Sequence, residues 1–462
     1  MKITIEKELM TKIKMYYIIS FAAIQFLSNV PTLGNVHALL RLFLPIGLLL
    51  IAIDFMYFRT REFLKSPNIY LILFLIAYVI TILVNGRMAI YESVKSFLWM
   101  CIQLLLICNT FSEINWEYGK KYWFSLSWVY ITLTAIASTI SLYYYFSQRY
   151  FIVQNNLFQG YYWDRLFGIY REPNFASCFA LISIACSVFI IRELSHIKTF
   201  IKKWLIFNVL IQCMYFAGAG SRTGLVAIST TVFIYALYNA ARFSVRKGRK
   251  RAFRAVLISI LCVLMVYPSY FVLRTGMSCA AEVVNEVNVV ITNYIRGDSV
   301  ALDTIMAPRV NRTPYSDDIS SGRLVCWYAG INIWLKYPLI GVGDRNIQYF
   351  SELLPNIPAL PSSATHNSVI KVLASSGILG FVSLAVFASV ILRKCVRLLM
   401  LKDFSEEKRG CLEFFVLLAG MIFAASLFIE DLFFINSFQS IIFWISIGMI
   451  LNINQHIKKE GI

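Results

Sequence analysis

Charged residues are scarce in this sequence. Only 15% of its 462 residues are Asp, Glu, Lys or Arg and 58% are hydrophobic, whereas about a quarter of the residues in soluble domains are charged. This composition excludes an ordinary soluble enzyme and is typical of a protein that faces lipid. A cleaved signal peptide is not expected either, because the apolar stretch from Met15 to Val30 has no small-residue cleavage site before Pro31.

The motifs of several enzyme classes are also missing. The sequence has no CxxC pair and no His/Cys cluster, so it offers no zinc site. It has neither a GxxxxGKS phosphate loop nor a GxSxG nucleophile motif, and no DxD motif follows an apolar stretch. We therefore predict an activity without a metal or other cofactor. Cys279 and Cys326 are the two of the ten cysteines that lie in a long loop, where a disulfide and two free thiols both stay open.

Long hydrophobic runs dominate the rest of the chain. A helix that crosses a bilayer needs about 20 mainly apolar residues. By this measure we predict an all-α membrane protein with about twelve transmembrane helices, at Met15–Val30, Leu42–Phe58, Ile69–Val84, Phe97–Phe111, Trp123–Phe146, Phe175–Ile191, Trp204–Ala219, Thr223–Ala241, Ala255–Leu273, Ser368–Leu392, Phe414–Phe428 and Phe438–Ile453.

The positive charges indicate an orientation. With the N-terminus inside, the cytoplasmic segments hold 28 of the 43 Lys and Arg, seven of them in the run 242–254. We therefore expect both termini in the cytoplasm of a multi-pass protein of the bacterial inner membrane. The basic run is expected to face membrane lipid headgroups and not nucleic acid. The chain then divides into helices one to nine (1–273), an extracytoplasmic loop (274–367), and helices ten to twelve with a cytoplasmic tail (368–462).

The extracytoplasmic loop is long enough to contain helices. Apolar residues recur in it at helical spacing and Pro338 ends the pattern. Two interpretations stay open: an amphipathic helix on the membrane surface with its tryptophans at the headgroups, or a helix packed beneath the loop. The residues of this pattern are Leu324, Trp327, Tyr328, Ile331, Trp334 and Leu335.

Three polar motifs open predicted helices on the outer side. They are Arg165–Asn174, Gly218–Gly224 and Ala364–Ser368. The unpaired N–H groups and the dipole at a helix N-terminus favour an anion, and glycine lets the backbone approach it closely. Four arginines near these motifs would add positive charge for a diphosphate: Arg165, Arg171, Arg222 and Arg323.

Each motif also has a purely structural interpretation. Pro173 suits the first position of a helix, with Asn174 beside it, and Ser221 is a common N-cap residue. The arginines favour a functional interpretation instead. Arg222 lies at the predicted membrane boundary, where an unpaired guanidinium is costly and usually functional.

Histidine is rare, and one of the four stands out. His196 and His456 fall on the predicted cytoplasmic side and His37 in the first outer loop, so His366 alone adjoins the arginine-bearing motifs. Its imidazole suits a general base near neutral pH. The alternative is an interfacial histidine that caps a helix or hydrogen-bonds locally.

Taken in order, these motifs resemble the O-antigen ligase and O-antigen polymerase superfamily. The resemblance covers roughly residues 160 to 385, and the first four helices match in hydropathy alone. It is carried by Arg165 with Pro173-Asn174, Gly220-Ser-Arg-Thr-Gly224, Arg323 with Trp327, Pro338-Leu-Ile-Gly-Val-Gly343, Thr365-His-Asn367 and Gly377-Ile-Leu-Gly380.

The resemblance implies metal-independent transfer of an undecaprenyl-diphosphate-linked oligosaccharide at the extracytoplasmic face. By position, Arg222 and Arg323 would hold the diphosphate and His366 would lie beside the acceptor hydroxyl; these are the predicted catalytic residues. The resemblance also suggests a chain-length regulator protein as a partner. The predicted substrate-binding residues are Arg165, Arg171, Asn174, Ser221 and Asn367.

Polymerase and ligase share these motifs. We favour a polymerase of O-antigen, capsule or exopolysaccharide repeat units, with a ligase that moves O-antigen to the lipid A core of lipopolysaccharide as the alternative. A flippase for the same lipid-linked units is a third possibility. A transporter places its polar residues near the bilayer midplane, whereas here they concentrate at the outer face.

Overall fold

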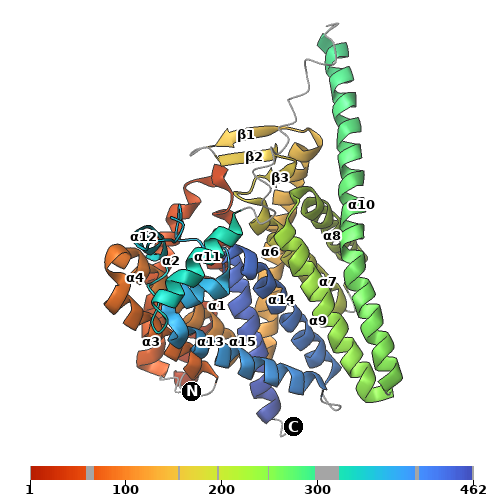
Figure 1. Ribbon diagram of the computed structural model, residues 1–462. Coiled ribbons are helices and arrows are strands. Elements are labelled where there is room, and N and C mark those ends of the chain that lie inside the picture. Colours follow the sequence, from red (N-terminus) through yellow and green to blue (C-terminus); the bar gives the residue numbers. More distant parts are fainter. Residues whose placement is uncertain are drawn as a thin grey trace. The chain divides into compact units, whose positions relative to one another are not determined.

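The computed structural model describes residues 2–58, 67–153, 157–194, 197–247, 249–296, 322–400 and 405–459. These residues form helices and one small sheet (Figure 1). The chain divides into two compact units, unit 1 with residues 1–26, 36–123 and 318–462, and unit 2 with residues 27–35 and 124–317. The all-α membrane fold is thereby confirmed.

Unit 1 contains both ends of the chain. Its backbone has short 3₁₀ and π-helical segments between some helices, among them the π-helix η5 (Ile102–Cys108) between α4 and α5. Its helices are α1 (Lys2–Leu27), α2 (Val36–Ile53), α3 (Asn68–Asn85), α4 (Ile90–Cys101), α5 (Asn109–Glu113), α11 (Arg323–Lys336), α12 (Ile347–Leu353), α13 (Ser368–Met400), α14 (Glu406–Ile429) and α15 (Phe438–Lys459).

Unit 2 combines helices with an antiparallel sheet, which the sequence did not predict. The sheet order is β1-β2-β3, with β1 at Tyr150–Val153, β2 at Leu157–Tyr162 and β3 at Arg165–Gly168. The helices are α6 (Trp116–Phe146), which starts in unit 1, α7 (Pro173–Glu193), α8 (Thr199–Ala219), α9 (Arg222–Lys247) and α10 (Arg249–Arg296). Because α10 continues past Leu273 to Arg296, the first part of the predicted extracytoplasmic loop is helical.

Nine helices among the described residues are long and apolar enough to cross a membrane. Eleven of the twelve predicted segments lie within helical backbone, and the first, Met15–Val30, extends past the end of α1 at Leu27. The number twelve is not confirmed. One of the nine, Asn68–Glu113, contains two predicted segments, and the backbone leaves the helical region inside it at Ala89, with φ −137° and ψ 48°.

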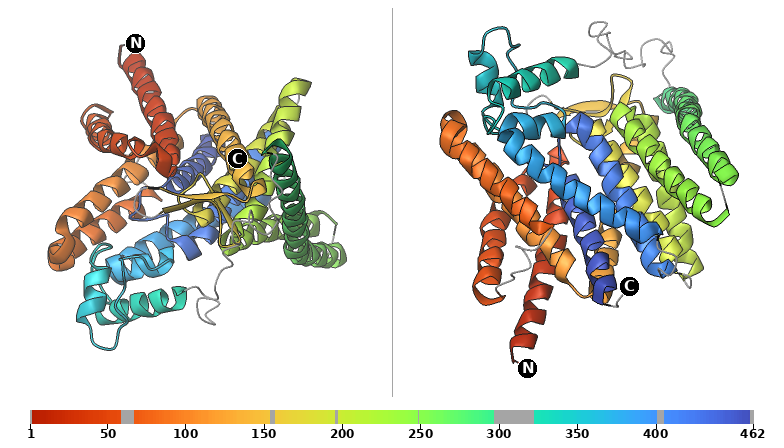
Figure 2. Two further views of the ribbon diagram at one scale, coloured as in Figure 1. Left: turned by 90° about the horizontal axis from the view of Figure 1, so that it is seen from above. Right: turned by 60° about the horizontal axis from the view of Figure 1, so that its bottom comes forward.

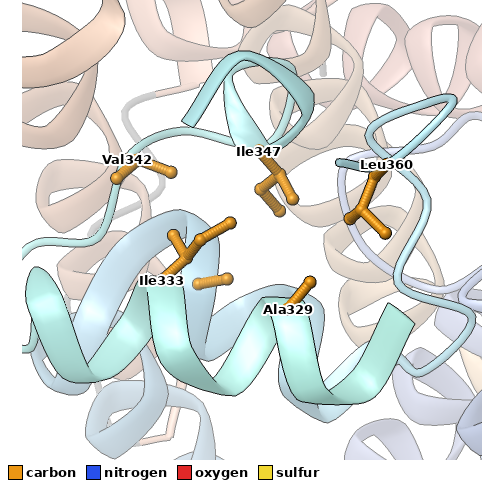
Figure 3. Packing of buried hydrophobic residues seen from close by; sticks show 6 residues of the cluster. Ala329, Ile333, Val342, Ile347 and Leu360 are labelled. Carbon is orange, nitrogen blue, oxygen red and sulfur yellow. The ribbon is translucent and has the colours of Figure 1, made fainter. Parts of the chain in front are cut away.

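Helix α11 packs on its own loop. Its buried face presents Ala329 and Ile333 to Val342, Ile347 and Leu360, which come from the following loop and from α12 (Figure 3). Helix α11 also lies beside α13 and α12 (Figure 2). The packed-helix interpretation therefore holds for this face, while Leu324, Tyr328 and Leu335 on the other face are exposed.

Helix α13 is broken at Gly377, where φ is 61° and ψ is −164°. The segment Pro338–Gly343 fills the break with its own backbone. The N–H groups of Ile378 and Leu379 donate to the carbonyls of Pro338 and Leu339, at 2.8 and 3.2 Å. On the other side of the break, the carbonyls of Ala374 and Ser375 accept hydrogen bonds from Val342 and Gly343, at 2.8 and 2.9 Å.

Two glycines make this close approach possible. A Cβ on Gly341 would lie 2.6 Å from the Ala374 carbonyl oxygen, and a Cβ on Gly377 would overlap the Leu339 carbonyl. Both residues also have positive φ, which is strained for any residue with a side chain. One backbone contact therefore explains Gly341 and Gly377, one glycine from each of the two predicted motifs 338–343 and 377–380.

Helix α3 holds the same segment from another side. Asn85 donates from Nδ2 to the Gly341 carbonyl at 2.7 Å, and the Thr81 hydroxyl donates to the Ile340 carbonyl. The Tyr78 hydroxyl donates to the carboxylate of Asp344, which follows the segment. These side chains lie at intervals of three and four residues, which is one face of a helix.

Candidate functional site

Three of the predicted site residues meet in unit 2. The Arg165 guanidinium donates from Nη2 to Asn174 Oδ1 at 2.9 Å, and the Ser221 hydroxyl donates to the same oxygen at 3.0 Å. Arg165 Nε also donates to the Ala219 carbonyl at 3.0 Å. We call Arg165, Asn174 and Ser221 the arginine cluster. It joins the start of β3, the first turn of α7 and the residue before α9.

Local geometry fixes each member of the arginine cluster. Asn174 Nδ2 donates to the Glu172 carboxylate, which orients the amide so that its oxygen faces Arg165. Ser221 Oγ accepts from the Gly224 N–H at 3.1 Å and so caps α9. The structural interpretation of Ser221 is therefore correct, and its hydroxyl proton serves the cluster as well.

The other two predicted site arginines of unit 2 are more open. Arg222 is the first residue of α9, directly after Ser221, and its side chain is exposed. Arg171 is also exposed, and its backbone N–H donates to the Asn29 carbonyl at 2.9 Å. The structure places Arg222 beside the arginine cluster in sequence but gives Arg171 no hydrogen bond to it among the described contacts.

A buried ionic network lies in unit 1. Lys371 Nζ is 3.6 Å from Glu430 Oε1, and the two side chains are 4% and 5% exposed. The Thr365 hydroxyl donates to the other carboxylate oxygen at 2.6 Å, and the Thr365 N–H donates to that oxygen too. Charges this deeply buried need such partners, because an unpaired one costs several kcal/mol, on the order of 3–5. We call Thr365, Lys371 and Glu430 the glutamate network.

His366 and Asn367 follow Thr365 directly and have different roles. Asn367 Oδ1 accepts from the N–H groups of Val369 and Ile370, at 2.9 and 3.1 Å, and so caps α13. His366 is exposed in the left-handed region with φ 52°. Since Asn367 provides the cap, the interpretation of His366 as a helix cap is wrong. Its exposed imidazole lies between Thr365 and Asn367, and hydrogen bonds hold both of these residues.

Arg323 lies at the start of α11. Its guanidinium is 5.8 Å from the centre of the Phe428 ring, a cation–π distance. Phe428 precedes Glu430 by two residues, and the Trp327 ring is 6.1 Å from the Phe428 ring. Arg323 and the Thr365-His366 segment therefore both border the end of α14 within unit 1. Arg165, Asn174, Ser221 and Arg222 belong to unit 2.

Comparison with known families decides the relationship. Residues 207–385 match the family model described as O-antigen ligase. We refer to residues 207–385, the part of the chain that is similar to this family, as the O-antigen ligase domain. The match confirms the resemblance to the O-antigen ligase and polymerase superfamily, whose members transfer glycans and act on lipid-linked glycans. No curated protein matches the chain.

The O-antigen ligase domain contains only some of the predicted site residues. Those inside it are Ser221, Arg222, Arg323, His366 and Asn367. The remaining predicted residues, Arg165, Arg171 and Asn174, precede the matched segment, and Glu430 follows it. The hydrogen bonds from Ser221 to Asn174 and from Arg165 to the Ala219 carbonyl nevertheless connect this preceding sequence to the domain.

Sequence reasoning missed the glutamate network. Its signal was present, because Lys371 and Glu430 both lie at the ends of strongly apolar helices, where a charge is costly and usually has a partner. The Lys371 ammonium also donates to the carbonyls of Asp344, at 3.2 Å, and of Ser363. The Lys371 side chain thus contacts Glu430 and both ends of the segment from Asp344 to Ser363.

Asp344 is a second buried acid that the sequence did not single out. Its carboxylate is 3.0 Å from Arg345 Nε and accepts hydrogen bonds from Ser96, at 3.1 Å, and from Tyr78. Burial raises the pKa of Asp344 above its ordinary value of 3.8, while the nearby Lys371 and Arg345 act in the opposite direction. The domain therefore buries an acid next to the segment that closes the α13 break.

Cys279 and Cys326, the two cysteines of the predicted extracytoplasmic loop, are free thiols, and both lie within the O-antigen ligase domain. Cys279 is exposed on α10 and Cys326 is half-buried on α11. Burial, together with the charge of Glu430, raises the pKa of the Cys326 thiol. A raised thiol pKa lowers the thiolate fraction and makes a nucleophilic role unfavourable.

Proposed function

We propose that this protein is a glycosyltransferase that polymerises undecaprenyl-diphosphate-linked oligosaccharide repeat units on the extracytoplasmic face of the bacterial inner membrane. The observation that carries this proposal is the arginine cluster. It places a fixed guanidinium, Arg165, at the N-termini of α7 and α9. The family match supports the same class of substrate.

The arginine cluster suits a diphosphate for electrostatic reasons. The dipoles of α7 and α9 both direct positive potential toward their first turns. Arg165 is held by hydrogen bonds to Asn174 and Ala219 and needs no reorganisation when an anion binds. Arg222 adds an exposed cation at the first position of α9.

The reaction needs stabilisation of the leaving group and removal of one proton. The acceptor sugar hydroxyl oxygen forms a bond to the anomeric carbon of the donor. The bond between that carbon and the phosphate oxygen breaks, and its electron pair leaves on undecaprenyl diphosphate. In the proposal, which follows the family resemblance here, Arg222 and Arg323 are assigned to stabilising the leaving group and His366 to accepting the hydroxyl proton. The reaction is proposed to need no metal.

A ligase is the second candidate, because the matching family model is described as O-antigen ligase. Its donor chemistry is the same, and its acceptor is lipid A core in place of a second repeat unit. The flippase interpretation is weakened by the break in α13. In transporters, broken helices expose backbone groups to substrate and ions, whereas Pro338–Gly343 already occupies the groups at Gly377.

Reconstitution separates these functions. The purified protein is placed in vesicles with an undecaprenyl-diphosphate-linked oligosaccharide, with lipid A core added in a parallel sample, and the products are separated on a gel. A ladder of products is the result expected for the polymerase. Transfer to lipid A core alone would establish the ligase, and movement of unchanged donor across the vesicle membrane would establish the flippase.

A further inference from the structure

The three-stranded sheet of unit 2, drawn in Figure 1, carries a group of aromatic residues whose rings contact one another. The rings of Phe158 and Tyr162 are stacked with centroids 3.9 Å apart and planes at 3°. The Trp163 ring continues the stack at 4.9 Å from Tyr162, and the Tyr150 ring lies 5.2 Å from Tyr162 on the neighbouring strand. We call Tyr150, Phe158, Tyr162 and Trp163 the aromatic platform. Tyr150 and Trp163 are 39% and 36% exposed.

The turn that carries Trp163 is strained. Strands β2 and β3 are joined by two residues, Trp163 and Asp164, since Tyr162 pairs with Arg165. Both turn residues have positive φ, 53° and 55°. Asn and Gly are the residues that adopt this type of turn readily, and a bulky tryptophan in it is an outlier. Strain of this kind persists where surrounding structure enforces it and is concentrated at functional positions.

Surrounding residues enforce this turn from two sides. Arg274 Nη2 donates to the Asp164 backbone carbonyl at 2.7 Å and to its carboxylate at 3.1 Å. The Tyr161 hydroxyl donates to the other carboxylate oxygen at 2.6 Å. A Cβ on Gly220 would lie 2.6 Å from Arg274 Nη1, so the glycine before Ser221 makes room for this guanidinium. The turn and the arginine cluster are therefore adjacent in the chain at two points. Arg165 follows Asp164 directly, and Gly220, which leaves room for Arg274, precedes Ser221.

We propose that the aromatic platform binds sugar rings of the lipid-linked oligosaccharide, stacking them next to the diphosphate. This inference rests on the proposed function. The sugar of such a donor is bonded directly to the diphosphate, and Arg165 of the arginine cluster follows the Trp163-Asp164 turn in the chain. The C–H bonds on one face of a pyranose carry partial positive charge and are attracted to the negative face of an aromatic ring.

Membrane headgroups are the other possible neighbour for exposed aromatic rings. A ring that only anchors a helix end in headgroups needs no particular backbone conformation. Trp163 is instead kept in a strained turn that Arg274 and Tyr161 hold through Asp164. That construction fixes the direction of the ring, as recognition of a rigid ligand requires.

The variant Trp163→Gly tests the proposal without disturbing the turn, because glycine adopts positive φ without strain. Tyr162→Leu removes a second ring and keeps the strand. The matched control is Tyr143→Leu, which removes an aromatic ring that is 60% exposed on α6, outside the platform. Two probes are titrated calorimetrically into each purified full-length variant: the oligosaccharide released from the donor by mild acid, and farnesyl diphosphate, which has no sugar.

We expect Trp163→Gly and Tyr162→Leu to weaken oligosaccharide binding at least about tenfold, equal to 1.4 kcal/mol, and to leave farnesyl diphosphate binding unchanged. The Tyr143→Leu control should bind both probes like the wild type. Wild-type oligosaccharide affinity in Trp163→Gly would overturn the proposal, as would failure of the wild type to bind the oligosaccharide. Equal weakening of both probes would also overturn it, since the hairpin would then serve only to position Arg165.

The same titrations separate this proposal from the proposed function. If Arg165→Gln binds farnesyl diphosphate like the wild type, the assignment of the arginine cluster to a diphosphate fails, whatever the platform does. If the platform variants keep oligosaccharide affinity but unfold at lower temperature in lipid nanodiscs than in detergent, relative to wild type, the rings anchor the protein in headgroups and the sugar proposal is wrong.

Discussion

The side-chain oxygen of Asn174 accepts hydrogen bonds from both the Arg165 guanidinium and the Ser221 hydroxyl. One amide oxygen therefore links three segments that are up to 56 positions apart in the sequence, from 165 to 221. A neutral acceptor at this point orients the Arg165 guanidinium without placing a negative charge of its own beside it, whereas a carboxylate in the same place would add one.

This relationship predicts the effect of Asn174→Asp. The substitution keeps the size of the side chain and the two hydrogen bonds that Oδ1 accepts, but it pairs Arg165 with a negative charge and replaces the Nδ2 donor to Glu172 with a second carboxylate oxygen. We expect KM for the lipid-linked donor to rise on the order of tenfold, about 1.4 kcal/mol. An unchanged KM in steady-state assays would show that the charge of Arg165 is not used for binding.

Arg222→Ala and Arg323→Ala are predicted to lower the rate of glycan transfer by about 10²-fold or more, the usual loss when a group that stabilises a leaving anion is removed. Lysine should restore activity only in part, because it lacks the planar fork that binds two phosphate oxygens. Arg192→Ala, at the opposite end of α7 from Asn174, is the matched control. Transfer should be measured at equal amounts of membrane-inserted protein, and full activity of either alanine variant would remove that arginine from the site.

His366→Gly separates chemistry from structure. Glycine adopts the left-handed backbone of residue 366 more readily than histidine, so the α13 cap by Asn367 should be preserved. If the imidazole is the general base, turnover should fall about 10²- to 10⁴-fold with little change in stability. Single-turnover rates with saturating donor provide the measurement. A variant as fast as the wild type would leave the reaction to leaving-group stabilisation by the arginines.

The α13 break predicts different outcomes for two glycines. Gly377→Ala should destabilise the protein by about 1–3 kcal/mol or more, because its backbone conformation is open almost only to glycine, and its Cβ would also overlap the Leu339 carbonyl. A Cβ on Gly276 in α10 meets no atom within 4 Å, so Gly276→Ala should stabilise the helix by up to about 1 kcal/mol. Thermal unfolding in detergent compares the two variants, and equal midpoints would show that Pro338–Gly343 does not close the break in solution.

The raised pKa of Asp344 predicts a dependence of stability on pH. The folded protein holds this proton more tightly than the unfolded chain, so the stability that the group contributes is complete below pH 3.8 and is lost as pH rises through the higher folded pKa. Asp344→Asn removes this loss. The difference in unfolding midpoint between Asn variant and wild type should therefore grow in favour of the variant as pH rises from about 4 through that pKa. A difference in unfolding midpoint that stays constant over this pH range would contradict the raised pKa of Asp344.

Much of this arrangement could be predicted from the sequence. Apolar runs locate helices reliably, because the bilayer demands length and hydropathy from each one. Eleven of the twelve predicted segments lie within helical backbone, and the first extends past the end of α1. The polar motifs likewise led to Arg165, Asn174 and Ser221, which the structure joins by hydrogen bonds.

Other features depend on contacts between distant segments, which local patterns do not encode. The sheet is built from the aromatic-rich stretch between α6 and α7, where no clear alternation of apolar and polar residues marked the strands. The motifs 338–343 and 377–380 were recognised separately, but their pairing appears only in three dimensions. Lys371 and Glu430 are 59 residues apart, so nothing in either local sequence identified the other as its partner.

The break at Gly377 also sets an order for the biogenesis of the protein. Two N–H groups and two carbonyls of α13 take their hydrogen bonds from Pro338–Gly343, and each such group left unsatisfied in lipid costs several kcal/mol. The ribosome makes this segment before α13, so the partner is already present when the helix leaves the translocon. Helix α13 is thus not a self-sufficient span. We expect a variant with a deletion within 338–343 to be degraded by membrane proteases, so that little protein accumulates in the membrane.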